Sequence, residues 1–213
     1  MSQPRVTQLL IATRNRGKLA EFRQLFAALP AVEVIALDYI AVVVPEVIED
    51  GATFEDNARK KAIEVAARTR MLVLSDDSGL EVDALDGRPG VHSARYAGAG
   101  ARDEDNNQKL IHDLRDVPAE LRTARYRVVL ALADPEGPLA ASVHLEHGAC
   151  EGTIRRDPRG QNGFGYDPYF EPHGHTRSMA ELSPEEKNRI SHRAEAAENM
   201  RRFLERYLPT RAL

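Results

Sequence analysis

The chain has 213 residues, of which 42% are hydrophobic and 29% charged, and its formal net charge is −4. This is an ordinary globular composition, and a chain of this length can bury a core without disulfide staples. The acidic balance argues against a nucleic-acid partner, and no apolar stretch reaches the roughly 20 residues that cross a bilayer, so we expect no membrane partner. The single cysteine, Cys150, excludes an internal disulfide and favours a cytoplasmic location.

The N-terminal half alternates short apolar runs with helical patterns. Its N-terminal apolar segment is too short for a typical signal peptide and is better explained as a strand. The pattern predicts a strand at Gln8–Thr13, a helix at Lys18–Leu29, a strand at Val32–Leu37, a short apolar run at Ala41–Val44, a helix from the N-cap Thr53 to about Thr69, and a strand at Met71–Leu74.

The C-terminal half adds a hairpin and further helices. We expect a helix at Asn106–Leu114, a hairpin of Tyr126–Ala133 and Leu139–Glu146, a helix capped by Ser183, and a last helix that buries Ala194, Ala197, Leu204 and Leu208. The hairpin argues against a purely parallel sheet. The sequence therefore predicts an α/β fold with a mixed sheet flanked by helices in two lobes, in a single domain over residues 1–213.

Two adjacent carboxylates, Asp76 and Asp77, follow the apolar run that ends at Leu74. One interpretation is a turn at the end of the strand, since Asp, Ser and Gly are common turn residues. The other is a divalent-cation site, in which Glu49 of a distant loop supplies a third carboxylate. Mg²⁺ prefers a few carboxylate oxygens together with water and substrate phosphates.

Basic residues near a helix start are candidate phosphate ligands. The segment "TRNRGK", Thr13–Lys18, lies between a predicted strand and helix, where free N–H groups and the helix dipole favour an anion. It lacks the spacing of a Walker A loop, and an ordinary basic turn is the alternative. Lys61, on the helix that follows Glu49, is a further cation.

Two later segments have the chemistry of a nucleobase site. In "NGFGYDP", glycines flank Phe164, whose ring could stack on a base, although core packing of Phe164 and Tyr166 is an equal alternative. In "EKNRISHRAEA", His192 and Arg193 offer donors to a carbonyl oxygen. The 6-amino group of adenine is itself a donor and would face these donors without forming a hydrogen bond. This pair could therefore distinguish a 6-keto purine from adenine. His173 and His175 lack the partner pattern of a zinc site.

Together these segments resemble the inosine/xanthosine triphosphate pyrophosphatase family, which acts on non-canonical purine nucleotides. The resemblance runs from "LLIATRNRGKLAEF" through "EDGATFEDNARKKA", "LSDDSGLEVDALDGRPGVHSARYAG" and "GFGYDPYF" to "ELSPEEKNRISHRAEA". It implies Mg²⁺-dependent hydrolysis of ITP, dITP and XTP to the monophosphate and pyrophosphate, an elongated α/β fold with the active site in the cleft between two lobes, and a homodimer.

The resemblance also implies a role for each matching residue. Asp77 corresponds to the general base and to a metal ligand, with Glu49 and Asp76 as the other metal-site carboxylates. The implied substrate-binding residues are Thr13, Arg14, Asn15, Arg16, Gly17, Lys18, Lys61, Ser78, Phe164, Gly165, Tyr166, Asp167, Lys187, His192 and Arg193. Arg14 departs from the family's usual Thr-Gly-Asn or Ser-Asn-Asn turn. It would be strained if a positive φ were required there, and otherwise it could add a phosphate contact.

Two other functions fit parts of this pattern. A metal-dependent phosphomonoesterase would use the same acidic residues but release inorganic phosphate. A nucleotide-sensing module would bind without turnover, and it would need a defective metal site, although Glu49, Asp76, Asp77 and Lys18 are all present.

Overall fold

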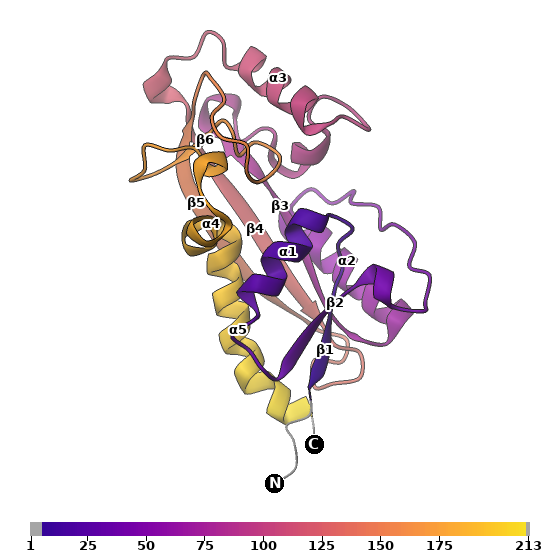
Figure 1. The fold of residues 1–213 in the computed structure, drawn as a ribbon. Helices are drawn as coiled ribbons and strands as arrows, with labels where there is room; N and C mark the ends of the chain where they lie inside the picture. The colour runs from indigo at the N-terminus through magenta and orange to yellow at the C-terminus, as the bar shows by residue number, and fades with distance from the viewer. Residues whose placement is uncertain (1–5, 212–213) are drawn as a thin grey trace. The chain divides into compact units, whose positions relative to one another are not determined.

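The computed structural model describes residues 6–211 and contains a six-stranded sheet with the strand order β2-β1-β3-β4-β5-β6 (Figure 1). β1 (Thr7–Ile11) is parallel to β2 (Val32–Ala36) and to β3 (Leu72–Val82), whereas β5 (Val143–Ile154) and β6 (Phe170–Pro172) are antiparallel. β4 (Thr123–Ala133) is the neighbour of β3 and β5. The predicted α/β class with a mixed sheet is confirmed.

Five α-helices accompany the sheet within the described residues. They are α1 (Arg16–Leu25), α2 (Phe54–Thr69), α3 (Asp103–Asp113), α4 (Pro184–Ile190) and α5 (His192–Arg211). Over residues 6–211, no helix is both long and apolar enough for a membrane span.

The chain divides into two compact units. Within the described residues, unit 1 comprises 6–77, 129–147 and 195–211, and unit 2 comprises 78–128 and 148–194. Neither unit is a continuous segment, because β3, β4, β5 and α5 each contribute residues to both. The single domain and the cleft expected from the sequence stay predictions.

Unit 1 is built around the parallel strands β1 to β3. Leu9, Leu10 and Ile11 are fully buried, as expected for a parallel strand covered on both faces. In Figure 1, α1 and α2 lie beside these strands. Phe22 of α1 and Ala62 of α2 each have no exposed surface, so the helices bury their apolar faces in this core.

Unit 2 has its own apolar core, formed by α3 and parts of β3, β4, β5 and β6. Tyr126 of β4 packs on Phe170 of β6, with ring centroids 4.6 Å apart and planes inclined by 49°. Leu80, Leu110 and Ile154 belong to the same core. The alternation of buried and half-buried residues at the start of β4 places Tyr126 on the inner face.

Strand β3 differs from its prediction. We expected a strand that ends at Leu74, and it continues to Val82 through both aspartates. A buried strand can include polar residues when their side chains have hydrogen-bond partners. Ser75 here donates to the backbone oxygen of Ala58 at 2.5 Å. The turn interpretation of Asp76 and Asp77 is therefore wrong.

Several element limits also differ. α1 begins at Arg16, earlier than predicted, because the Asn15 side chain accepts the Lys18 N–H at 3.0 Å and caps the helix there. The helix ends at Leu25, before the predicted Leu29. Residues 41–44 form no strand. In α5 the predicted Ala194 is only half-buried. The predicted N-caps are confirmed: Thr53 accepts from the N–H of Asp56, and Ser183 accepts from that of Glu186.

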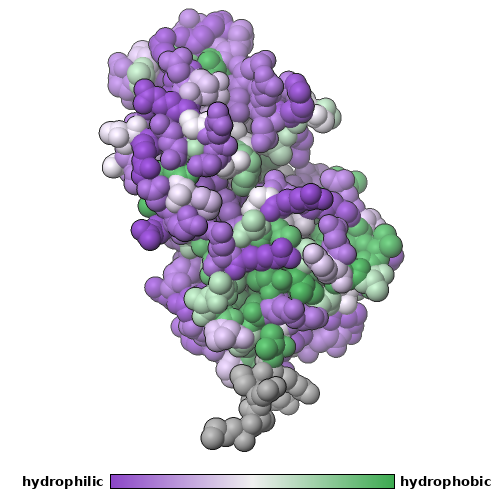
Figure 2. All heavy atoms as spheres, viewed as in Figure 1, coloured by the Kyte–Doolittle hydropathy of each residue, from purple (hydrophilic) through white to green (hydrophobic). Residues whose placement is uncertain are grey.

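Apolar side chains also reach the surface of unit 1. In Figure 2, green surface gathers over β1, β2 and the loop after β2, whereas the surface formed by α3 is largely hydrophilic. The large exposed hydrophobic residues of the loop after β2 and of α2 are Tyr39, Val42, Val43, Ile48 and Ile63.

Candidate active site

The segment between β1 and α1 presents polar groups to solvent. Arg14, Asn15 and Arg16 are exposed, and Thr13 Oγ1 accepts the N–H of Asn15 at 3.2 Å. The start of α1 leaves backbone N–H groups without helical partners, and the helix dipole adds positive potential there. The turn thus has the exposure and the sign of charge that an anion site needs.

Arg14 adopts this turn without left-handed backbone. Within residues 6–211, non-glycine residues with positive φ are confined to Arg70, Asp86 and Ala140. Instead, the Arg14 guanidinium donates to the backbone oxygen of Val44 at 2.6 Å. The departure from the family pattern therefore causes no strain, and it ties the turn to the loop after β2.

Two lysines form ion pairs with carboxylates of unit 1. Lys18 Nζ lies 2.7 Å from Asp76 Oδ2, and Asp76 is only 1% exposed. Lys61 Nζ donates to the backbone oxygen of Asp76 at 2.7 Å and forms an ion pair with Glu49. Burial lowers the pKa of Lys61, but the charges of Asp76 and Glu49 raise it further, so the net pKa is above its usual value. Lys61 is therefore a cation at neutral pH.

Asp77 is held by an asparagine that sequence reasoning missed. Asn57 of α2 donates from Nδ2 to Asp77 Oδ2 at 2.9 Å, and its Oδ1 accepts the N–H of Gly51 at 2.7 Å. Asn57 is 1% exposed. One amide thus connects the aspartate to the loop that carries Glu49.

The charge state of Asp77 is unusual. Burial raises its pKa to about 6, and the hydrogen bond from Asn57 opposes this effect. The charge of Glu49 raises the pKa further, while Lys61 and Lys18 lower it. A carboxyl group with a pKa near neutrality is well matched to accept a proton in catalysis.

The donor set of unit 1 fits a hard cation in part. Glu49 and Asp77 supply carboxylate oxygens and are close enough for the charge of Glu49 to affect Asp77. Over residues 6–211, however, no three His, Cys, Asp or Glu side chains are grouped as a metal site. Asp76 is ion-paired with Lys18, so its predicted role as a ligand stays a prediction. Mg²⁺ often takes only one or two carboxylates and completes its shell with water and phosphate.

In unit 2, Asp167 organises the predicted base-binding residues. Its Oδ2 accepts from Lys187 Nζ at 2.7 Å and from the backbone N–H of Phe164 at 3.0 Å, and its Oδ1 accepts from the Tyr126 hydroxyl at 3.2 Å. Asp167 is only 3% exposed. Because a carboxylate has about four acceptor positions, most of its capacity is used within the protein.

The glycine loop around Phe164 is fixed by α3. Asp103 accepts the N–H of Gly165 at 2.6 Å, and Asn107 donates to the carbonyl of Gly165 at 2.9 Å. Lys187 Nζ lies 4.7 Å from the centroid of the Phe164 ring. The ring is half-buried, which is consistent with the predicted stacking surface.

His192 and Arg193 begin α5 and are both buried. The His192 ring stacks on Tyr126, with centroids 4.9 Å apart and planes 14° from parallel. Arg193 donates from Nη2 to Ser78 Oγ at 3.1 Å, and its guanidinium lies 5.8 Å from the Phe164 ring centroid. The structure therefore brings Ser78, Phe164, Asp167, Lys187, His192 and Arg193 into one cluster.

Tyr166 belongs to the core of unit 2. It is 5% exposed, and its hydroxyl donates to the backbone oxygen of Ser93 at 2.8 Å. Burial raises the pKa of its phenol above the usual value. Core packing, the alternative interpretation, describes this side chain.

Asn57 and Tyr126 were absent from the sequence-based candidates. Tyr126 lies in an apolar strand and has the pattern of a core residue. Asn57 follows the cap of α2, where polar residues are common. A polar atom at an inward position, here the tyrosine hydroxyl, is the signal that could have identified Tyr126.

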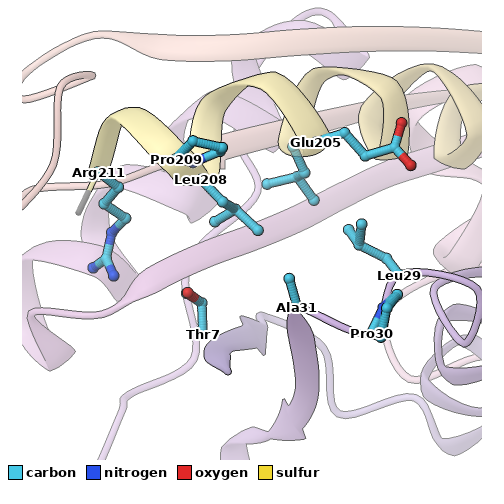
Figure 3. Close-up of a pocket in the computed structure, with 9 residues that line it drawn as sticks. Thr7, Leu29, Pro30, Ala31, Glu205, Leu208, Pro209 and Arg211 are labelled. Atoms are coloured by element: carbon cyan, nitrogen blue, oxygen red, sulfur yellow. The ribbon is translucent and has the colours of Figure 1, made fainter. Parts of the chain in front are cut away.

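A surface pocket of about 410 Å³ lies elsewhere in unit 1. In Figure 3, Leu208 of α5 faces Leu29 and Ala31, while Glu205 and Arg211 lie at the ends of the view. None of the predicted site residues lines this pocket.

The sequence is similar to proteins of known family. Residues 9–203 match the model of the Ham1 family. The dITP/XTP pyrophosphatase of Shouchella clausii is 47% identical over 204 residues, which cover 96% of this chain and 100% of that protein. The dITP/XTP pyrophosphatase of Geobacillus kaustophilus is 49% identical over 189 residues, covering 89% of this chain and 90% of that protein.

Solved structures show the same similarity in three dimensions. The HAM1 protein of Coxiella burnetii has a TM-score of 0.83 and 40% identity, and the match covers 94% of this chain and 100% of that chain. The Ham1 protein of Staphylococcus aureus has a TM-score of 0.80 and 37% identity, with 93% and 98% covered.

Proposed function

The chain belongs to the Ham1 family, and from that premise we propose that it hydrolyses ITP, dITP and XTP to the nucleoside monophosphate and pyrophosphate. Curated relatives named dITP/XTP pyrophosphatase support dITP and XTP as substrates, and ITP is added from the family resemblance. The observation that carries the proposal is the buried carboxyl group of Asp77, which accepts a hydrogen bond from Asn57 and lies next to Asp76, the partner of Lys18 and Lys61.

Unit 1 supplies the groups for the phosphate chemistry. Asp77 orients a water molecule and accepts its proton as the water attacks the α-phosphorus. Lys18, Lys61 and the Thr13–Lys18 turn stabilise the negative charge that develops on the departing pyrophosphate. Lys61 is restrained by Glu49 and by the backbone of Asp76, so its charge is positioned before the reaction.

Glu49 and Asp77 would hold a Mg²⁺ ion. Bound there, Mg²⁺ would supply Lewis-acid stabilisation to phosphate oxygens. This assignment rests on the two carboxylates and on the cation's preference for oxygen ligands.

Unit 2 supplies recognition of the base. Phe164 stacks on the purine, and His192 and Arg193 donate to the 6-keto oxygen. An adenine amino group would leave these buried donors unpaired, which costs about 1–3 kcal/mol. That energy corresponds to a preference of about 5-fold to 150-fold for keto purines.

A product assay tests the proposal. ITP, dITP, XTP, ATP and GTP are incubated with the protein and Mg²⁺, and pyrophosphate and inorganic phosphate are measured separately. We expect pyrophosphate from the first three substrates and little turnover of ATP. Inorganic phosphate as the first product would favour the phosphomonoesterase, and binding of ITP without either product would favour the nucleotide sensor.

We also propose a homodimer, as the family resemblance implies. The exposed apolar residues of unit 1 are consistent with a protein that buries surface on association. Sedimentation equilibrium tests this proposal, and the mass of a single chain at micromolar concentration would contradict it. A cytoplasmic location remains an expectation from the single cysteine.

A further inference from the structure

Tyr126 contacts two of the residues assigned to the nucleobase. Its ring stacks on His192, with centroids 4.9 Å apart and planes 14° from parallel. Its hydroxyl donates to Asp167 Oδ1 at 3.2 Å. The side chain is only 8% exposed, so both contacts are shielded from water.

The stack limits the orientation of the His192 ring. Hydrogen bonds of an imidazole lie near the ring plane, so a neighbour that fixes this plane also fixes the direction of the ring N–H. Phe170 packs against Tyr126 at 4.6 Å with the planes inclined by 49°. Tyr126 is thus held by the core of unit 2 and in turn holds His192.

The hydroxyl extends this support to the glycine loop. Asp167, which accepts from Tyr126, also binds Lys187 and the backbone of Phe164 through its other oxygen. Burial raises the pKa of the Tyr126 phenol well above its usual value, so the hydroxyl remains a neutral donor. Tyr126 therefore contacts both His192, the proposed donor to the base, and Asp167, the carboxylate that holds the loop carrying Phe164.

We propose that Tyr126 is a positioning residue for base specificity: its ring orients His192 toward a 6-keto purine, and its hydroxyl holds Asp167. This inference rests on the proposed function, because it needs a keto purine as the ligand. Tyr126 itself does not contact the nucleotide in this proposal.

Two substitutions separate the ring from the hydroxyl. Tyr126→Phe removes the hydrogen bond and keeps the stack, whereas Tyr126→Leu removes both. Tyr126→Met is a second variant without a ring, should the leucine variant fail to fold, because methionine adapts to irregular core space.

Tyr207 offers a matched control outside this cluster. It is also buried, its hydroxyl donates to Asp134 at 2.7 Å, and its ring stacks on Phe203 at 5.3 Å. Tyr207→Phe and Tyr207→Leu therefore remove the same kinds of contact within unit 1. They report the effect of lost stability alone.

Binding of the α,β-imido analogues of ITP and ATP is measured by calorimetry, together with kcat/KM for ITP and ATP. We expect Tyr126→Leu or Tyr126→Met to reduce the ITP-over-ATP preference about tenfold, the effect of one misdirected donor. Tyr126→Phe should keep the preference within about threefold while weakening both ligands, since only the support of Asp167 is lost. Both Tyr207 variants should retain the wild-type preference.

The outcomes separate this inference from the proposed function. An unchanged preference in the ringless Tyr126 variants, or an equal loss in Tyr207→Leu, would overturn the inference. A wild-type protein that prefers the ITP analogue but releases no pyrophosphate from ITP would refute the function and leave the inference standing. A wild-type protein without any base preference would overturn the inference directly.

Discussion

Burial in the folded protein disfavours the ionised form of Asp77. Its pKa is about 6 in the folded protein against an ordinary 3.8, with burial as the largest cause. Because the folded pKa is the higher one, ionisation opposes folding: stability falls as the pH rises from about 4 to 6, and the full cost remains above that range. Catalytic groups commonly carry such a cost.

Replacing Asp77 with asparagine should therefore raise stability while removing activity. In metal-free buffer at pH 8, we expect Asp77→Asn to increase the free energy of unfolding by about 1–3 kcal/mol, the range that a pKa difference of this size allows. Near pH 4 the two proteins should differ little, because Asp77 is then protonated. Hydrolysis of ITP should fall by about 10²-fold or more.

Urea unfolding with EDTA at both pH values, and a pyrophosphate assay with Mg²⁺, test this prediction. A variant less stable than wild type at pH 8 would contradict the assigned cost of burial. Near-normal turnover would contradict the role of Asp77 as the base.

Asn57 should affect how tightly Mg²⁺ binds, because it contacts both Asp77 and the loop that carries Glu49. We expect Asn57→Ala to raise the Mg²⁺ concentration for half-maximal activity by about 10–100-fold, as is typical when a residue that orients a ligand is lost. Its matched control is Asn106→Ala in α3. Asn106 is also buried and bridges two backbone groups, accepting from Ala97 and donating to Ala94.

Kinetics at a series of Mg²⁺ concentrations compare the two variants. Both should lower thermal stability, and only Asn57→Ala should change the Mg²⁺ requirement. An equal change in both would show that the effect comes from general loosening of the fold.

At the scale of single residues, the sequence revealed charged groups more readily than neutral ones. Asp77 stands out because it follows an apolar run, Lys18 because it lies at a predicted helix start, and Lys61 because it lies on the helix after Glu49. Asn57 and Tyr126 act through side-chain contacts with residues 20 and 41 positions away. Such contacts depend on the folded backbone, so no local spacing reveals them.

Among the elements, β3 shows where local patterns fail. Asp76, Asp77, Ser78 and Gly79 have strong turn preferences, yet they continue the strand. Partners from α1 and α2 satisfy the buried aspartates, and this tertiary effect overrides local preference. By contrast, the capping box of α4 was predicted correctly, because all its contacts lie within Ser183–Glu186.

The glycine loop before α4 permits a sharper test. Gly163 and Gly165 both have positive φ, +77° and +62°, so alanine causes similar backbone strain at each. A Cβ at Gly163 would overlap the Asp167 carboxylate, whereas nothing lies within 4 Å of a Cβ at Gly165. Gly163→Ala should therefore displace Asp167, and Gly165→Ala should not.

We expect Gly163→Ala to raise the KM for ITP at least about tenfold more than Gly165→Ala does, since it disturbs the support of Lys187 as well as the loop. Steady-state kinetics and thermal unfolding of both variants provide the comparison. Equal KM values at similar stability would show that the position of Asp167 does not matter for substrate binding.

At the scale of the whole molecule, membership in the family is confirmed, as is the enzyme class of a nucleoside-triphosphate pyrophosphatase. The candidate residues fall into two groups by unit. The carboxylates and lysines of the phosphate chemistry lie in unit 1, and the aromatic and donor residues for the base lie in unit 2. Alternation of strands and helices predicted the fold class, but the sequence carries no local mark of where β3, β4 and β5 pass from one unit to the other.

This division predicts that rate and base preference can be changed separately. Lys18→Met in unit 1 should lower kcat/KM for ITP and ATP alike by about 10²-fold, because it removes a charge that stabilises pyrophosphate. His192→Ala in unit 2 should lower the ITP-over-ATP ratio about tenfold, because only the keto purine uses the lost donor. Since substitutions at independent sites are additive in free energy, the double variant should show the product of the two losses. We measure kcat/KM for ITP and ATP with the wild type, the two single variants and the double variant. A changed ITP-over-ATP ratio in Lys18→Met would show that the two groups of residues are coupled. A loss in the double variant far from the product of the two single losses would show the same.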